Sequence, residues 1–400
     1  MQKINLWREE AVEADGWTTV SIITERSNRV RIPLWYKIPS EYNSLITESC
    51  DPFVIATVLF AMTRSFDLVV HGTVSPSLLR NLEEFQAAWS SWRPGVYQPI
   101  EIRADVEQEE LRRVTSKQAI TAFSGGVDSS LTVWRHQTGH CGRRELNIKA
   151  GLMVHGFDIP LAKQEVFERA TTKAQTMLNS LGVKLIPMVT NFRELPLNWE
   201  DAFGTAAASC LMLLQKRYSV GLIASSFPYQ ALSFPYGSNP VTDRLLSSKS
   251  FQIVHDGAEF NRIEKMRQLK AWPECLENLR VCWQGEEADK NCGRCEKCVR
   301  TILIGRIAGM SLPACFTEDI SDQEIENIEV TEGPLTEMER VLDAAKAADI
   351  TDSWVSALEK CIRRNKDKVK RQELKAKLKK QFPLAVLERR RRKKTRPWMP

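Results

Sequence analysis

Residues 117–130 read KQAITAFSGGVDSS, and this stretch decides the fold. The apolar residues of 117–123 predict a buried strand, and the pattern that follows predicts a helix starting near Ser129. Gly125 and Gly126 permit a tight turn with positive φ and carry no Cβ to obstruct a ligand. Backbone N–H groups in such a turn, together with a helix N-terminus, bind anions. The sequence therefore predicts a phosphate-binding loop between a strand and a helix.

Polar side chains of this loop fit the same interpretation. Ser124, Ser129 and Ser130 add hydroxyl donors for phosphate oxygens. Asp128 would repel a polyphosphate unless a cation lies between them, and Mg²⁺ bridging the phosphate oxygens is the simplest account. The alternative is an ordinary strand–helix turn that binds no ligand.

Short apolar strands alternate with helices downstream of the loop. Repeated βα units of this kind predict a parallel sheet covered by helices on both faces, which is a doubly wound α/β fold. The expected strands cover 117–123, 148–156, 183–190 and 219–226, and the expected helices cover 161–182 and 201–218.

Two further regions flank this unit, so we expect three domains. Residues 1–115 would form an N-terminal α/β accessory domain, 116–312 the central domain, and 313–400 a helical extension ending in a basic tail. The expected flanking elements are strands at 17–25, 30–38 and 67–74, helices at 51–62, 76–89, 336–349 and 353–381, and an acidic linker at 105–113.

The charge of the chain is unevenly distributed. Residues 361–400 hold 17 Lys and Arg against 3 Asp and Glu, whereas the remaining residues hold 39 against 47. The run at 389–396 could therefore bind nucleic acid or an acidic partner, and the alternative is a solvated chain end. The longest apolar stretch, 52–62, is far too short to span a membrane. No signal or transit peptide is recognisable, so we expect a cytoplasmic protein without a membrane partner.

Four of the ten cysteines lie close together in the sequence with the spacing C-x9-C-x2-C-x2-C. Four thiolates that leave no open position are typical of a structural Zn²⁺ site, and an iron–sulfur cluster uses the same ligands. Gly293 permits the turn between two of the ligands. The predicted ligands are Cys282, Cys292, Cys295 and Cys298, and Arg294, Lys297 and Arg300 would offset their charge.

The string SGGVDS after a strand resembles the signature of the PP-loop ATP pyrophosphatases. Combined with the downstream cysteine pattern, it resembles the 7-cyano-7-deazaguanine synthase (QueC) family over roughly residues 116–311. The resemblance implies the HUP fold, which is the adenine nucleotide alpha hydrolase-like fold. Residues 1–115 and 335–400 are additional to the stand-alone synthase, and the chain looks most like the long members found in bacterial antiviral defence clusters of the Qat and CBASS types.

The resemblance implies a reaction and a set of residues. The family uses ATP to adenylate 7-carboxy-7-deazaguanine, forms an amide with ammonia, and uses a second ATP to make the nitrile. Residues 124–130 (Ser124, Gly125, Gly126, Val127, Asp128, Ser129 and Ser130) would hold the ATP phosphates and Mg²⁺. Met153 and His155 lie where the family contacts adenine, although His155 is equally interpreted as a satisfied polar residue. Arg262 and Lys265 would assist Asp128 on the pyrophosphate side. The alternative is that Glu264 and Lys265 are solvated helix positions.

The implied substrate side departs from the family. The loop 224–248 could stack Phe227, Tyr229, Phe234 and Tyr236 on the purine-like ring, and Asp243 could bond the guanine-like amino group. A simpler interpretation is an ordered surface loop. The family's Pro-Asp-Cys-Arg-like substrate string is absent, which leaves the nitrile product open. The amine could be ammonia or a protein amine of a partner from a defence operon. The alternatives are a tRNA-modifying PP-loop enzyme and a non-catalytic nucleotide-binding subunit.

Overall fold

The computed structural model describes residues 2–26, 31–110, 118–282, 284–285, 287 and 289–381. The chain divides into two compact units. The first comprises residues 1–291 with 313–315, and the second comprises residues 292–312 with the chain from 316 onward. The division into three domains at residues 115 and 312 stays a prediction.

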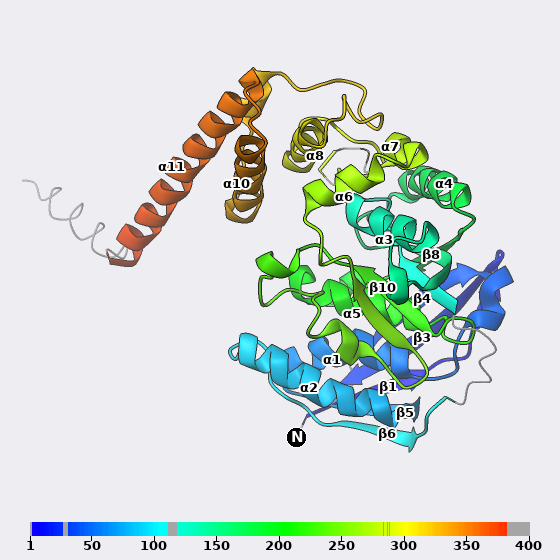
Figure 1. The fold of residues 1–400 in the computed structure, drawn as a ribbon. Coiled ribbons are helices and arrows are strands. Elements are labelled where there is room, and N and C mark those ends of the chain that lie inside the picture. Colours follow the sequence, from blue (N-terminus) through cyan, green and yellow to red (C-terminus); the bar gives the residue numbers. More distant parts are fainter. Residues whose placement is uncertain are drawn as a thin grey trace, which may run out of the picture. The chain divides into compact units, whose positions relative to one another are not determined.

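A large, mostly parallel sheet forms the first unit (Figure 1). Its strands run in the order β11-β10-β7-β8-β9-β4-β3-β1-β5-β6, and β2 pairs with β3. These strands are β1 (Lys3–Arg8), β2 (Val12–Ala14), β3 (Trp17–Arg26), β4 (Arg31–Pro39), β5 (Asp67–Val74), β6 (Ile102–Glu107), β7 (Gln118–Ala122), β8 (Asn147–His155), β9 (Lys184–Thr190), β10 (Val220–Ala224) and β11 (Gln252–Asp256).

The first unit also contains seven of the described α-helices. They are α1 (Asp51–Arg64), α2 (Pro76–Trp92), α3 (Val127–Gln137), α4 (Gln164–Ser180), α5 (Trp199–Met212), α6 (Arg262–Leu269) and α7 (Pro273–Asn278). Short 3-10 helices are η1 (Ser40–Leu45), η2 (Gly142–Arg144), η3 (Phe192–Glu194), η4 (Tyr229–Ala231) and η5 (Asp243–Leu246). The mixed α/β class and the alternation of strands and helices predicted from the sequence are confirmed.

The strand order places a topological switch point beside β7. From β7 the chain moves to β8 and β9 on one side, and then returns to β10 and β11 on the other, with all five strands parallel. Crossovers between parallel strands are right-handed. When new strands are added on the other side of β7, the connecting helix therefore lies on the opposite face of the sheet. Accordingly, α5 groups with α1 and α2, away from α3 and α4 (Figure 1). Open α/β sheets bind ligands at the carboxyl ends of the strands at such a point.

The N-terminal strands extend the same sheet. β1, β5 and β6 are parallel to one another, and the antiparallel pair β3–β4 connects them to β9. The connection between β4 and β9 is short, with Tyr36 opposite Thr190 and Lys37 opposite Val189. Helix α1 is buried around most of its circumference because it packs against both α5 and β5. Strands from both sides of residue 115 therefore belong to one sheet.

Several boundaries differ from the sequence-based expectations. Helix α3 begins at Val127, two residues before the expected start, because Gly126 already has the extended backbone of an N-cap. The segment expected as a linker begins inside β6, which forms the edge of the sheet beside β5. Strands β1 and β11 were not predicted; β1 pairs with β3 and β5, and β11 pairs with β10.

The second unit is helical. Its helices are α8 (Glu296–Ile307), α9 (Asp322–Asn327), α10 (Glu332–Ala347) and α11 (Ser353–Gln381). Helix α10 packs against α8 and α11, and α9 packs against α11. The helices expected at 336–349 and 353–381 are confirmed. The basic run at 389–396 lies outside the described residues. Within the described ranges, no helix combines the length and apolar character needed to cross a bilayer.

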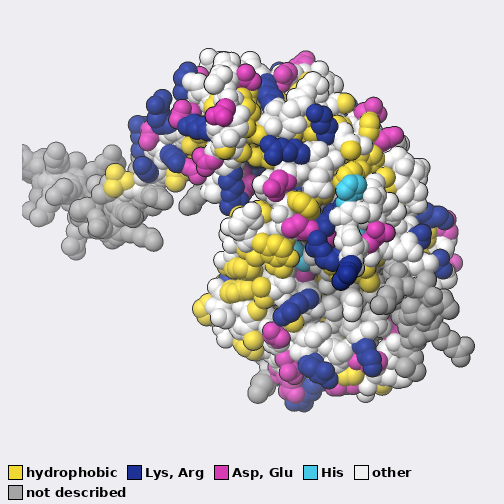
Figure 2. Space-filling view, viewed as in Figure 1, with side chains coloured by type: hydrophobic (Ala, Val, Ile, Leu, Met, Phe, Trp, Pro, Cys, Tyr) yellow, Lys and Arg dark blue, Asp and Glu magenta, His cyan; other side chains and the backbone are white. Residues whose placement is uncertain are grey.

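Surface charge is mixed rather than segregated on the face shown in Figure 2, where Lys and Arg side chains alternate with Asp and Glu. Hydrophobic side chains are interspersed among them. An extended field of one sign is the pattern expected to steer a nucleic acid. The described residues on the face in view do not form such a field.

The backbone of helix α5 and the backbone of the loop that follows β10 are in direct contact. The N–H of Gly237 donates to the carbonyl oxygen of Glu200 at 2.7 Å. A Cβ built on Gly204 would lie 2.0 Å from the carbonyl oxygen of Gly237. Only glycine at position 204 leaves room for this contact, which positions the loop 227–241 against α5.

We expect Gly204→Ala to lower the free energy of unfolding by about 2–3 kcal/mol, because the added methyl group forces α5 and the loop apart. Denaturant unfolding followed by circular dichroism measures the change. Gly95→Ala is the matched control, since a Cβ there would meet nothing within 4 Å. Identical unfolding midpoints for the Gly204→Ala and unmodified proteins would show that the contact does not matter.

Candidate functional site

The loop between β7 and α3 has the backbone that its sequence predicts. Gly125 has a φ of +73°, and Gly126 is the extended N-cap of α3. The hydroxyls of Ser124 and Ser129 lie 3.3 Å apart, and the Ser124 hydroxyl accepts from the N–H of Gly126 at 3.3 Å. The first N–H groups of α3 have no acceptor within the helix, as in any α-helix. The loop therefore combines hydroxyls and N–H groups at one helix end.

Asp128 lies at the start of α3 between two cations. Its Oδ1 accepts from Nζ of Lys265 at 2.9 Å, and its Oδ2 accepts from the guanidinium of Arg262. Lys265 is only 2% exposed and also donates to the carbonyl oxygen of Ser225 at 2.5 Å. Both cations come from α6, which starts with a capping box of Asn261 and Glu264. The cluster thus joins α3, α6 and the end of β10 at the switch point.

The charges of this cluster determine its ionisation. Burial alone would raise the pKa of Asp128, but the positive charges of Arg262 and Lys265 outweigh burial and hold the pKa below its ordinary value. Asp128 is therefore an ionised carboxylate at neutral pH. The carboxylate of Asp128 thus contacts both cations beside the loop.

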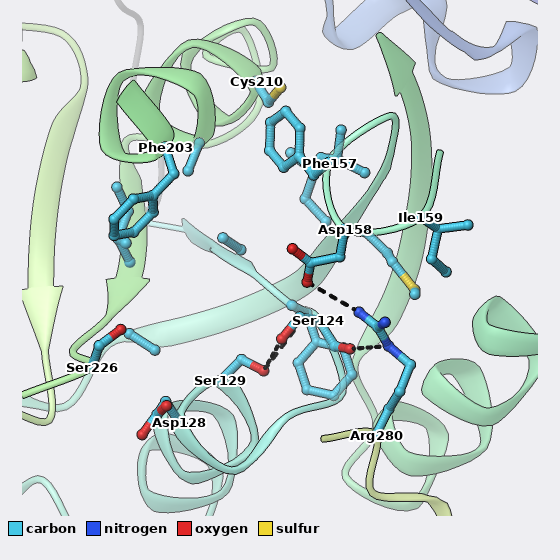
Figure 3. Close-up of a pocket in the computed structure, with 18 of the residues that line it drawn as sticks. Ser124, Asp128, Ser129, Phe157, Asp158, Ile159, Phe203, Cys210, Ser226 and Arg280 are labelled. Carbon is cyan, nitrogen blue, oxygen red and sulfur yellow. Dashed lines mark hydrogen bonds and ion pairs between the residues drawn. The ribbon is translucent and has the colours of Figure 1, made fainter. Parts of the chain in front are cut away.

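A cavity of about 260 Å³ opens at the carboxyl ends of β7, β8 and β10 (Figure 3). The phosphate loop contributes Ser124, Asp128 and Ser129 to one wall. The other wall is apolar and aromatic, with side chains from α5 and from the loop after β8. It includes Phe157, Trp199, Phe203, Cys210 and Ile223. A polar wall facing an aromatic one suits a ligand that carries both phosphate and a flat ring.

The two residues predicted to contact adenine are placed differently. Met153 lines the cavity. His155 is buried outside the cavity lining, where its ring stacks on Phe167 and its Nε2 lies 2.9 Å from the carbonyl oxygen of Pro160. Burial lowers the pKa of His155, so the ring is neutral near pH 7. His155 is thus a satisfied polar residue in this structure.

The predicted substrate residues fall into three groups. Phe227 and Tyr236 pack edge to face at 4.9 Å, and Tyr236 packs on the cavity residue Phe203 at 5.0 Å. Burial raises the pKa of Tyr236, which stays a neutral phenol. Tyr229 is 55% exposed, and Phe234 stacks on Trp92 at 5.0 Å. Only the Phe227–Tyr236 pair therefore lies against the cavity wall.

Asp243 is not part of the cavity lining. It is fully buried and binds Nδ1 of His255 at 2.8 Å, the hydroxyl of Ser238 at 2.6 Å and the N–H of Asn239 at 3.1 Å. This arrangement holds the loop 237–243 against β11. The Asp243–His255 pair joins two segments that no sequence pattern connects.

Arg280 and Asp158 complete the cavity. Both line it, and the guanidinium of Arg280 lies 3.4 Å from Oδ2 of Asp158 (Figure 3). Phe157 and Asp158 belong to the strand end 153–158, which the resemblance predicts to lie near adenine, and both line the cavity. Arg280, Trp199 and Phe203 were not predicted as site residues. No local pattern in the sequence marks Arg280.

Four cysteines converge within the described chain. The sulfur atoms of Cys282, Cys292, Cys295 and Cys298 all lie within 4.8 Å of one another. Two of them, Cys292 and Cys298, are 3.9 Å apart, close to the spacing of about 3.8 Å between two thiolates on one Zn²⁺. The N–H of Gly285 donates to the Cys282 sulfur at 3.3 Å, and the N–H of Cys295 donates to the Cys292 sulfur at 3.3 Å. The cluster could hold a metal such as zinc.

Comparison of the chain with protein-family models, with curated proteins and with solved structures gives no match. The function is therefore argued from the residues and their geometry.

We expect Asp128→Asn to lower the free energy of unfolding by about 3 kcal/mol at pH 7, because it leaves buried Lys265 facing Arg262 without an anion. This loss of unfolding free energy should stay constant between pH 8 and pH 5. A carboxyl with a lowered pKa stabilises the fold fully above its unfolded-state pKa of about 4, and loses this effect only as the pH falls through the folded-state value. Urea unfolding at several pH values measures it.

The control for this prediction is Glu277→Gln, which removes an exposed carboxylate from α7. It should leave stability unchanged. If the difference between Asp128→Asn and the unmodified protein disappears between pH 7 and pH 5, the carboxylate is not held ionised by its neighbours.

We expect the purified protein to contain about one zinc ion per chain, because four thiolates fill a tetrahedral site. Cys295→Ser should lose this zinc, whereas Cys50→Ala, a buried cysteine outside the cluster, should keep it. Atomic emission spectrometry measures the metal content. Iron in place of zinc, with a visible absorption band, would indicate an iron–sulfur cluster.

Proposed function

We propose that this protein is an ATP-dependent carbon–nitrogen ligase of the PP-loop type. It would activate the carboxylate of 7-carboxy-7-deazaguanine or a close analogue for attack by an amine. The observation that carries the proposal is the SGGVDSS loop at the switch point, with Asp128 held between Arg262 and Lys265 beside a cavity. The resemblance to 7-cyano-7-deazaguanine synthases of antiviral defence clusters supplies the substrate class and a cytoplasmic setting.

The strand order supports the proposed HUP fold. The first strand of the parallel series, β7, is central, with the second and third on one side and the fourth and fifth on the other. This order, 3-2-1-4-5, is that of the first five strands of the classic doubly wound fold, in which phosphates bind after the first strand. The loop after β7 occupies that place.

Each group at the loop has a task in the proposed reaction. The loop N–H groups and the N-terminus of α3 would bind the phosphates of ATP. Arg262 and Lys265 would stabilise the charge that develops on departing pyrophosphate. Asp128 would hold Mg²⁺, which would supply positive charge to offset that of the phosphates. Because Asp128 now contacts both cations, ligand binding would redistribute these contacts.

The proposed reaction has two steps, and the bonds formed and broken balance in each. A carboxylate oxygen attacks the α-phosphorus, the bond to the α,β-bridging oxygen breaks, and pyrophosphate leaves with the electron pair. An amine then attacks the acyl carbon, loses a proton, and AMP leaves as the amide forms. A second ATP would adenylate the amide oxygen with loss of pyrophosphate, and the nitrile would form as the amide nitrogen loses its protons and AMP leaves carrying that oxygen. The amine is ammonia or a protein amine, and the product mass distinguishes the two.

The aromatic wall would hold the flat rings. Phe157, Trp199 and Phe203 line the cavity opposite the loop, and Tyr236 supports Phe203 from behind. Offset stacking on such side chains contributes about 1 kcal/mol beyond area burial. Asp243 is already satisfied by His255 and Ser238, so the deazaguanine amino group would find its partner among other residues.

We expect purified protein with ATP, Mg²⁺ and 7-carboxy-7-deazaguanine to release pyrophosphate, and the rate to fall at least about 100-fold in Asp128→Ala. Pyrophosphate assay and mass spectrometry, with and without ammonium, measure release and product. Glu277→Ala serves as the matched control. No substrate-dependent pyrophosphate from the unmodified protein, alone or with tRNA, would contradict the proposal and favour a non-catalytic nucleotide-binding subunit.

A further inference from the structure

We infer that Arg280 is a positioning residue of the proposed ATP site, and that it holds the phosphate loop in its anion-binding conformation. The inference rests on the proposed function only in taking ATP as the ligand. Arg280 lies 156 residues downstream of Ser124 in the sequence.

Arg280 contacts two successive carbonyl groups of the loop. Its Nε donates to the carbonyl oxygen of Ser124 at 3.1 Å, and its backbone N–H donates to the carbonyl oxygen of Gly125 at 2.8 Å. These carbonyls belong to the peptide groups that carry the N–H of Gly125 and the N–H of Gly126. One residue therefore fixes the orientation of two neighbouring peptide planes.

The orientation matters because a trans peptide points its C=O and its N–H in opposite directions. An anion-binding loop must direct its N–H groups toward the ligand and its carbonyl oxygens away from it. Arg280 occupies both carbonyls, so the corresponding N–H groups point away from Arg280, and that of Gly126 points toward the Ser124 hydroxyl. Without these bonds, Gly125 and Gly126 would be free to rotate, since glycine restricts φ least of all residues.

The two glycines also explain how Arg280 can come so close. A Cβ on Gly125 would lie 3.7 Å from Cβ of Arg280, and one on Gly126 would lie 3.5 Å from the Arg280 carbonyl oxygen. The segment 279–281 thus packs along the back of the loop at van der Waals distance.

The charge of Arg280 acts in the same sense as its hydrogen bonds. Its side chain is 8% exposed and lines the cavity, and its guanidinium pairs with Asp158, which is 49% exposed. A cation with little access to water beside the loop raises the local positive potential that a polyphosphate experiences. The exposed Asp158 is screened by solvent and offsets this potential only in part.

Neighbouring groups hold Arg280 in place. The side chain of Asn291 donates to the carbonyl oxygen of Leu279 at 2.8 Å, and its Oδ1 accepts from the N–H of Val281 at 2.9 Å. One amide group therefore brackets Arg280 on both sides. This support indicates a fixed position rather than a side chain that happens to rest on the loop.

The test is calorimetric binding of Mg²⁺·α,β-methylene-ATP, which carries the phosphates but cannot lose pyrophosphate, compared with adenosine, which lacks them. We expect Arg280→Ala to raise the Kd of the analogue about tenfold, the change expected for losing one charge-assisted hydrogen bond. The Kd of adenosine should change less than about twofold, because the loop contacts only phosphate. Arg280→Lys keeps the charge but not the planar fork, and should lie in between.

Arg80→Ala, which removes an exposed arginine of α2, is the matched control and should bind like the unmodified protein. If Arg280→Ala does not fold, Arg280→Met keeps the apolar stem without any N–H donor, and the same comparison is made with it. An unchanged Kd for the analogue would overturn the inference. Equal weakening of analogue and adenosine would also overturn it, because a general structural defect does not discriminate between them.

The failure of the inference and that of the proposed function are distinguishable. If the unmodified protein binds the analogue but releases no pyrophosphate, the proposed reaction fails and the binding comparison still decides the role of Arg280. If pyrophosphate is released and Arg280→Ala binds the analogue normally, the reaction stands and the inference fails. If the unmodified protein does not bind the analogue, both are overturned.

Discussion

The carboxylate of Asp128 between Lys265 and Arg262 is the interaction on which the rest of this structure depends. Lys265 is almost completely removed from water, and a buried cation needs an anion close by. Satisfying it requires α3, α6 and the end of β10 to meet at one point. This meeting point fixes the position beside β7 at which the strand order reverses. The cavity therefore lies there.

Two sets of contacts act on the loop in this region, one through its charge and one through its backbone. The ion cluster fixes the charge on one side of the loop, whereas Arg280 fixes the peptide planes from the other side. Between them lies a loop with two glycines, which has little conformational preference of its own. Contacts from distant parts of the chain therefore hold the loop in the shape that its own sequence permits.

This dependence explains what the sequence could and could not predict. The strands β7 to β10, helices α1 and α11 and the phosphate loop follow from local patterns, and they were predicted to within a few residues. Arg280, the Asp243–His255 pair, the inner strand β1 and the edge strand β11 depend on contacts between separate segments. No periodicity or spacing marks such contacts, because their partners are chosen by the packing of the sheet. The convergence of the four cysteines could be predicted, since their ligand spacing is local.

The short pairing of β4 with β9 has a consequence for solubility. A parallel sheet that stopped at β9 would present a row of unpaired N–H and C=O groups, which is a template for association with other chains. Tyr36 and Lys37 pair with the carboxyl end of β9, at Thr190 and Val189, and Asn191 beyond it bonds the backbone of Pro33 and of Trp35. The N-terminal strands therefore protect the carboxyl end of this edge. Excising them would expose it.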